Sequence, residues 1–326
     1  MDIGCVYLLP YTHHWKGDNP SMGLYDETRK IPVILDTDLG GDIDDTWAIA
    51  MMLKSPELDV KLIVTDHGNT IERTKILAKL LERAGRTDIP IGTGIMQDDD
   101  LLSQSAWVTD YDLANYSGTI HEDGVTALID TIMKSNEQIT LICIGPMPNI
   151  GEALRREPHI AEKARFVGMH GSIRRRHDGQ DGAIAEYNVI KDVAGAQAVF
   201  TAGWDKTITP LDTCGIVRLD GERYQAVCAS TDPLTQAVIE NYHIWLHGRE
   251  EAGCSSILFD TVAIYLAFTE ELLQMERLGI RVTDDGFTRV ETDAPVVNCA
   301  TEWKDLEAFK DLLVARLTVR DAQPVR

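Results

Sequence analysis

Five aspartates lie within ten residues of this chain, in the segment Asp36–Asp45. The apolar run Ile31–Leu35 precedes them directly, and a helix-like spacing of apolar residues begins after Thr46. This pattern predicts a buried strand that ends in carboxylates and leads through a turn into a helix. Five neighbouring carboxylates repel one another unless a cation neutralises them. We therefore expect a hard metal ion, Ca²⁺ first of all, because it favours several oxygen ligands.

Apolar runs of strand length alternate with helical patterns along the rest of the chain. The predicted strands are Pro32–Asp36, Val60–Thr65, Ile139–Ile144, Arg165–Met169 and Thr207–Leu211. One helix is predicted over Ile71–Ala84 with Gly85 as its cap, and another over Val193–Ala202 with Gly203 as its cap. This alternation predicts an α/β fold with a single open, mainly parallel sheet and helices on both faces.

Polar residues follow several of these strands. The segments that come after the second, third and fourth strands are Asp66–Asn69, Gly145–Asn149 and His170–Ser172. Farther along lie Glu186–Asn188 and an isolated acid, Asp260. Because the carboxyl ends of parallel strands meet at one edge of a sheet, we expect these groups to converge on a single site.

The whole chain sets broad limits. A net charge of −21 argues against nucleic acid, whose phosphates require Lys and Arg. No apolar stretch is long enough to span a membrane. The six scattered cysteines favour free thiols in a reducing compartment, and we expect a cytoplasmic protein. Residues 1–30 are expected to form an N-terminal extension, and residues 31–326 one catalytic domain.

The ordered motifs resemble the calcium-dependent nucleoside hydrolases, the inosine–uridine-preferring N-ribohydrolases. The family fingerprint D-x-D-x-G-x-D-D matches Asp36–Asp45 with a small insertion before the paired acids, and the resemblance runs from about Ile31 to about Leu317. It implies a Rossmann-like core, a ribonucleoside substrate that is split into free base and ribose, a Ca²⁺ cofactor, and a homodimer or homotetramer.

The same resemblance assigns roles residue by residue. Asp38, Asp45 and Asp260 are the implied calcium carboxylates, and Ile144 supplies a backbone carbonyl. Asp38 is also the implied general base. The implied substrate-binding residues are Asp44, Asn69, Met169, Glu186, Asn188 and Phe259.

Several other side chains have simpler expected roles. Asp36 braces the loop, and Asn149 caps the helix that follows it. Trp47 belongs to the core, and the run Asp98–Asp100 is a solvated loop.

The chain departs from the resemblance at Phe259. Many purine-cleaving members carry His at this position, where it protonates the leaving base, and Phe cannot donate a proton. The groups that remain for this task are solvent or one of His170, His177, Tyr242, His243 and His247. Trp245 is expected close to the base pocket. Two segments, 173–182 and 242–256, are expected to select the base.

The aspartate run is open to other interpretations. An EF-hand loop that starts at Asp36 needs Glu at its twelfth position, which is Trp47. A haloacid-dehalogenase-type phosphatase would use Asp36 as nucleophile and Asp38 as acid, but it leaves the later motifs unexplained. A third alternative is a plain solvated turn. A fourth, motivated by Phe259, is a calcium- and ribose-binding sensor that has lost catalysis.

Overall fold

A ten-stranded sheet forms the centre of the computed structural model, which describes residues 30–249 and 252–319. The strand order is β4-β3-β2-β1-β5-β6-β7-β10-β8-β9. Neighbours from β4 to β10 pair in parallel, whereas β8 is antiparallel to β10 and β9 to β8. The strands are β1 (Ile31–Thr37), β2 (Leu58–Thr65), β3 (Ile91–Thr93), β4 (Ile120–His121), β5 (Ile139–Cys143), β6 (Ala164–Met169), β7 (Lys206–Thr209), β8 (Leu273–Val282), β9 (Thr288–Val290) and β10 (Val296–Trp303).

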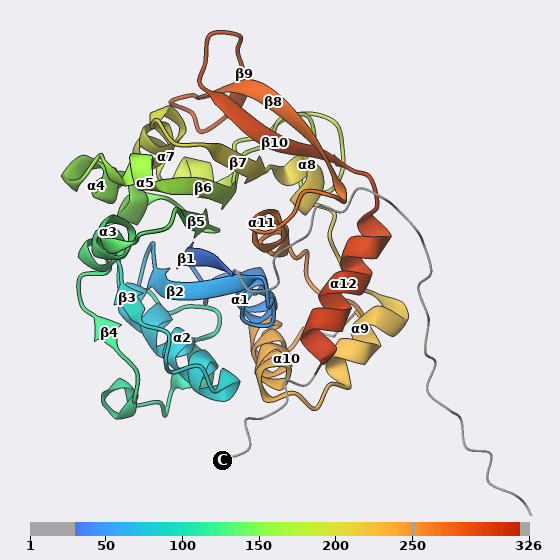
Figure 1. Ribbon diagram of the computed structural model, residues 1–326. Helices are drawn as coiled ribbons and strands as arrows, with labels where there is room; N and C mark the ends of the chain where they lie inside the picture. Colours follow the sequence, from blue (N-terminus) through green and yellow to red (C-terminus); the bar gives the residue numbers. More distant parts are fainter. Residues whose placement is uncertain (1–29, 250–251, 320–326) are drawn as a thin grey trace, which may run out of the picture.

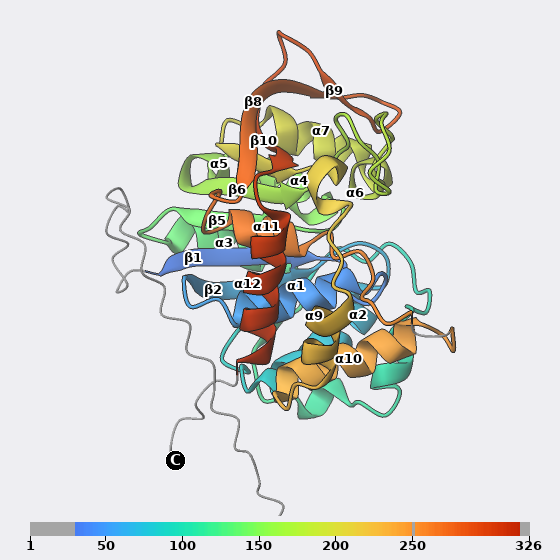
Figure 2. The ribbon, with the colours of Figure 1, turned by 90° about the vertical axis from the view of Figure 1, so that its right-hand side faces the viewer.

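Helices cover both faces of this sheet (Figures 1 and 2). One face carries α1 (Asp44–Leu53), α2 (Thr70–Ala84), α8 (Leu211–Cys214), α9 (Gly221–Cys228), α10 (Pro233–Trp245), α11 (Thr261–Leu266) and α12 (Leu306–Thr318). The other carries α3 (Gly124–Lys134), α4 (Pro148–Arg156), α5 (Ile160–Lys163) and α7 (Val193–Thr201). Short elements complete the chain: α6 (Tyr187–Lys191), η1 (Ser105–Val108) and η2 (Leu113–Asn115).

Successive residues of β1 enter two different cores. Val33 and Leu35 pack in the core that includes α1, while Ile34 packs in the core that includes α3 and α4. A strand buried on both faces reads as a continuous apolar run, which is why Ile31–Leu35 predicted it. The predicted architecture, one open and mainly parallel sheet covered on both faces, is confirmed.

All five predicted strands are present, as β1, β2, β5, β6 and β7. The fifth was predicted to reach Leu211, whereas β7 ends at Thr209 and Leu211 begins α8. Pro210 lies between them, and the strand ends before it because proline has no N–H to give to a neighbouring strand.

Both predicted helices are present, but only one predicted cap is. Gly85 ends α2 with φ of 66°, the left-handed conformation expected for a glycine cap. Helix α7 ends at Thr201, and the backbone of Ala202 is already extended. The prediction that Gly203 caps this helix is therefore wrong.

Strands β8, β9 and β10, at one end of the sheet, have no counterpart among the predicted strands, the last of which ends at Leu211. Strand β8 mixes buried, intermediate and exposed positions along its ten residues. It therefore lacks the continuous apolar run that marked the central strands. Its antiparallel pairing with β10 depends on long-range contacts that no local pattern encodes.

The predicted N-terminal extension lies outside the described residues, except for Lys30. Cys5 lies there as well, and the other five cysteines are free thiols. Among the residues that the structure describes, no helix is long and apolar enough to cross a membrane.

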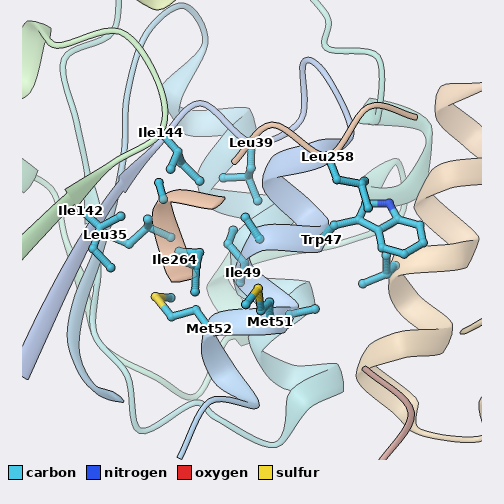
Figure 3. Packing of buried hydrophobic residues seen from close by; sticks show 14 of the residues in the cluster. Leu35, Leu39, Trp47, Ile49, Met51, Met52, Ile142, Ile144, Leu258 and Ile264 are labelled. Atoms are coloured by element: carbon cyan, nitrogen blue, oxygen red, sulfur yellow. The ribbon is translucent and has the colours of Figure 1, made fainter. Parts of the chain in front are cut away.

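Helix α1 fixes the aspartate run against the core. Every residue of α1 except Leu53 is buried, and Figure 3 shows its side chains packed among residues of β1, β5 and α11. Trp47 is fully buried and meets Tyr242 of α10 edge to face, so the prediction that it belongs to the core is confirmed. The acids at the start of α1 are thus held by a helix that is buried along nearly its whole length.

Candidate functional site

A cavity of about 660 Å³ opens at the carboxyl ends of β1, β5 and β6, the edge that the strand-end motifs predicted. This volume suits a small-molecule ligand. The residues that line it are Asp38, Gly41, Asp42, Asp44, Asp45, Arg73, Ser103, Ile144, Met169, His177, Ile184, Ala185, Glu186, Tyr187, Asn188, Ile190, Leu211, Trp245, Phe259 and Asp260.

Three carboxylates form a compact group in this cavity, and we call them the acid group: Asp44, Asp45 and Asp260. One oxygen from each lies within 4.8 Å of the others, and all three side chains are buried. Asp44 and Asp45 occupy the first turn of α1, and Asp260 precedes the first residue of α11. Thr37 Oγ1 also donates a hydrogen bond to Asp45 Oδ1 at 2.5 Å.

Burial and mutual repulsion make the charged forms of the three acid-group carboxylates unfavourable. Burial first, and then the neighbouring acids, raise the pKa of Asp44, Asp45 and Asp260 well above the ordinary value. No salt bridge within residues 30–249 and 252–319 joins any of the three to Lys, Arg or His. Because the donors are all carboxylate oxygens, they suit a hard divalent cation.

Asp38 lies beside the acid group but outside its 4.8 Å limit. Burial raises its pKa, while the charges of Arg73 and His67 act in the opposite direction. Gly145 passes so close that a Cβ there would lie 2.9 Å from Asp38 Oδ1. Of the predicted metal ligands, Asp45 and Asp260 thus belong to the compact group, while Asp38 and Ile144 line the same cavity. Asp44, predicted to bind ribose, is the third member.

Arg73 is the residue that the sequence predictions missed. Its guanidinium is buried in the cavity wall, where Nε donates to His67 O and Nη1 donates to Leu39 O, each at 2.7 Å. These two bonds fix the cation next to the aspartate turn. An Arg one turn into an amphipathic helix looks like an ordinary surface residue, so the sequence carried no signal for it.

The predicted sugar-binding residues Glu186 and Asn188 meet at the start of α6. Glu186 accepts hydrogen bonds from the N–H groups of Gly171, Asn188 and Val189 at 3.0, 2.7 and 3.3 Å. Burial nevertheless raises the pKa of Glu186 to about 7. Asn188 Nδ2 donates to Ile144 O at 3.0 Å and so ties this segment to the end of β5.

Asn69 is the one predicted substrate-binding residue that does not line the cavity. It caps α2, where its Oδ1 accepts from Glu72 N at 3.0 Å, and its Nδ2 donates to Asp100 O at 3.2 Å. Both ends of the amide are therefore used within the fold. The run Asp98–Asp100 is exposed, as predicted.

Four residues predicted for a leaving-group pocket lie outside the cavity lining. His170 is fully buried, with Nε2 at 3.0 Å from Gly145 O, and burial lowers its pKa to about 4. Tyr242 is buried and donates to Cys254 O at 2.8 Å. His243 and His247 are exposed, and α10 ends between them at Trp245.

The three residues from the base-side predictions that do line the cavity are Trp245, Phe259 and His177. They come from three separate segments: the end of α10, the turn before α11, and the loop after β6. Their placement depends on tertiary packing, because each is remote from the others in sequence.

A second set of polar side chains lies buried at the ends of β1, β2 and β5. Asp36, Asp66 and Cys143 lie close together with no exposed surface. Burial raises the pKa of Asp36 to about 6 and that of Asp66 well above its ordinary value. Asn149 Nδ2 donates to Asp36 Oδ2 at 2.9 Å. Asn149 therefore holds Asp36 in place; the prediction that it caps the following helix is wrong, because Met147 occupies the cap of α4.

Comparisons with known proteins find similar sequences over most of this chain. The family model for inosine-uridine preferring nucleoside hydrolase matches residues 33–311, which include the whole acid group. The non-specific ribonucleoside hydrolase RihC of Klebsiella pneumoniae is 29% identical over 268 residues, covering 79% of this chain and 85% of that protein. The pyrimidine-specific ribonucleoside hydrolase RihA of Escherichia coli is 30% identical over 246 residues, covering 68% of this chain and 74% of that protein.

Solved structures share the same fold. A plant nucleoside hydrolase, PpNRh1, superposes with a TM-score of 0.76 at 25% identity, covering 89% of this chain and 99% of that one. A purine-preferring ribonucleoside hydrolase from Gardnerella vaginalis gives a TM-score of 0.73 at 21% identity, covering 88% of this chain and 98% of that one.

Proposed function

This chain belongs to the inosine-uridine preferring nucleoside hydrolase family, and on that premise we propose that it hydrolyses the N-glycosidic bond of ribonucleosides. Water adds to C1′ of the ribose, and the bond from C1′ to the base nitrogen breaks, which leaves ribose and free base. The printed names of its relatives differ in base, being non-specific, pyrimidine-specific or purine-preferring, so they do not select one.

The observation that carries this proposal is the acid group at the strand ends, in a cavity of about 660 Å³. Cleavage of an N-glycosidic bond builds positive charge on the ribosyl ring, which becomes similar to an oxocarbenium ion. Buried carboxylates that face this ring stabilise that charge more than water does, because they are already oriented.

The acid group also fits a hard divalent cation, and we propose Ca²⁺. Asp45 and Asp260 would hold it, with Asp38 and the carbonyl oxygen of Ile144 beside them in the cavity. That carbonyl accepts one hydrogen bond from Asn188, which leaves its second lone pair available. The chemistry that a bound Ca²⁺ supplies is neutralisation of these acids and a lower pKa for the attacking water.

Asp38 is the proposed general base, which takes a proton from the attacking water. It lies at the end of β1 with only 8% of its surface exposed. Burial raises its pKa and makes its carboxylate a stronger base, while the charge of Arg73 limits this rise. A base whose pKa is closer to neutrality than that of an ordinary Asp suits proton abstraction in the cell.

Asp44, Glu186 and Asn188 are proposed to hold the ribose hydroxyls, with Met169 against the ring. Glu186 is positioned for this by three backbone N–H groups, so its carboxylate keeps one orientation. Asn69 caps α2 and donates to Asp100 O, and it does not line the cavity, so its predicted contact with the ribose stays a prediction.

The test compares Asp38→Asn with wild type in a reducing-sugar assay on inosine and uridine. We expect kcat to fall by about 10²–10⁴-fold, because general base catalysis contributes about that much. Exhaustive chelation should abolish turnover, and added Ca²⁺ should restore it and raise the Tm of the wild-type protein.

Asp130→Asn is a matched control, because Asp130 is an exposed residue of α3 paired with Lys134. Its activity should stay within about twofold of wild type, as expected for a surface site. Near-normal turnover by Asp38→Asn, or by the chelated wild-type protein, would contradict the proposal.

A further inference from the structure

The departing base poses a chemical problem that the acid group does not solve. When the bond from C1′ to the base nitrogen breaks, the electron pair stays on the base, and a donor must meet the charge that develops there. This reasoning rests on the proposed function. Phe259, next to Asp260 in the cavity wall, offers an aromatic face but no proton.

Only one imidazole lines the cavity among the described residues, that of His177. The carboxyl groups gather where the ribosyl charge develops. The guanidinium of Arg73 is tied to two backbone carbonyls, and guanidinium groups as a class do not act as proton donors to a leaving group. Tyr187 has its pKa raised by burial, which makes it a poorer acid. His177 is therefore the side chain in the cavity best suited to proton transfer.

His177 sits at the tip of a short hairpin, residues 174–182. The two sides of the hairpin are joined by hydrogen bonds from Arg176 N to Gln180 O at 2.9 Å and from Gly182 N to Arg174 O at 2.7 Å. Its base is fixed by the Asp212 carboxylate, which accepts from the N–H groups of Ile173, Arg174 and Arg175. These bonds give the tip a defined position.

The tip of this hairpin lies on the same wall as Phe259. His177 packs so closely on Gly215 that a Cβ on that glycine would lie 2.7 Å from His177 Cα. Two residues further along, Val217 O accepts a hydrogen bond from Leu258 N at 2.8 Å. Segment 215–217 thus contacts the hairpin tip through Gly215 and the residue before Phe259 through Val217.

Trp245 completes this wall. It stacks on Tyr242, with ring centroids 5.9 Å apart. Tyr242 donates to Cys254 O, and residues 254 and 255 pair with residues 219 and 220, the continuation of segment 215–217. An imidazole and two aromatic side chains are thereby gathered at one side of the cavity, as a planar heterocyclic base requires.

We propose that His177 is a catalytic residue that protonates the departing nucleobase, while Phe259 and Trp245 contact its ring. As the bond from C1′ to the base nitrogen breaks, the oxygen of water bonds to C1′ and the proton lost by the water passes to Asp38. The imidazolium of His177 gives its proton to the base. His177 is exposed at the cavity mouth, so solvent returns a proton to it after each turnover.

The test separates bond cleavage from protonation of the leaving group by changing the leaving group. The substrates are a panel of purine and pyrimidine ribonucleosides and p-nitrophenyl β-D-ribofuranoside, whose phenolate leaves without a proton. For His177→Ala and His177→Gln we expect kcat/KM on the nucleosides to fall by about 10²–10³-fold. On the p-nitrophenyl riboside it should stay within about threefold of wild type.

Arg175→Ala is the matched control. Its side chain is exposed on the same hairpin, and only its backbone N–H contacts Asp212, so its activity on both kinds of substrate should be unchanged. Equal losses by the His177 variants on both substrates would mean that His177 only positions the cavity wall, and would overturn the proposal. Unchanged nucleoside turnover would overturn it too.

The wild-type protein distinguishes failure of this proposal from failure of the proposed function. Turnover of the p-nitrophenyl riboside without turnover of any nucleoside would leave ribosyl hydrolysis intact and overturn protonation by His177. Absence of turnover on every substrate, with Ca²⁺ present, would overturn the hydrolase function and the role of His177 with it.

Discussion

Replacing Asp45 with Asn should stabilise the metal-free protein and weaken its binding of Ca²⁺. Asn keeps the shape of the side chain and an oxygen for the hydrogen bond from Thr37, but removes one buried charge. Burial and the charges of Asp38 and Asp44 raise the pKa of Asp45 well above its ordinary value. The ionised carboxylate is therefore a liability in the folded protein when no cation is bound.

The sign of this effect depends on pH. A carboxyl group whose pKa is raised on folding contributes stability below its unfolded pKa, and loses it as pH rises through the folded value. The variant should thus gain over chelated wild type at pH 8 and lose that advantage near pH 4. Each pKa unit of the rise corresponds to about 1.4 kcal/mol, or about 3–6 °C in Tm, since 1 kcal/mol shifts the Tm of a large domain by about 2–4 °C.

With Ca²⁺ present the advantage of the variant should shrink, because Ca²⁺ stabilises wild type more than it stabilises the variant. At a free concentration of 100 times its Kd, a ligand stabilises wild type by about 2.7 kcal/mol, or about 5–10 °C. If loss of one ligand charge weakens binding by about 100-fold, the same concentration stabilises the variant by only about 0.4 kcal/mol. The assay is thermal unfolding of both proteins at pH 4 and pH 8, with EGTA or Ca²⁺.

Two results would refute this reasoning. The first is that, in EGTA at pH 8, the Asp45→Asn protein is less stable than wild type, which would mean that the acids do not repel one another. The second is that the Tm of wild type does not respond to Ca²⁺, which would mean that the acid group holds no cation.

Two further predictions concern residues that hold the site. Gly145→Ala should lower kcat at least tenfold and cost about 1–3 kcal/mol of stability, because its Cβ would lie 2.9 Å from Asp38 Oδ1 and 2.8 Å from Asp66 Oδ2. Activity and urea unfolding check this against Gly203→Ala, where no atom lies within 4 Å; equal behaviour of the two variants would contradict it. Asn149→Ala should cost about 2–5 kcal/mol in urea unfolding, because Asp36, Thr65 O and Ile95 N lose their partner. The exposed Asn115→Ala is its control, and a cost as small as that of the control would show that Asn149 is not needed for this network.

The sequence by itself determined the central fold and the acidic character of the site. The apolar runs at β1 and β5 are nearly continuous because those strands are buried on both faces, so the sequence pattern alone predicts them. The aspartates after β1 had to lie at a strand end for the same reason. Strand β8 escaped prediction because a half-exposed strand carries no such pattern.

Tertiary structure decided which polar groups work together. Asp260 joins Asp44 and Asp45 only because α11 packs against the start of α1, more than 200 residues away in sequence. Asn69 and Asn149 follow similar turns, yet one caps a helix and the other holds Asp36. The sequence did not determine where each histidine lies either. His170 is buried in the core, while His177 lines the cavity from a hairpin. Spacing along a chain fixes which residues share an element, but only packing between elements decides which side chains meet.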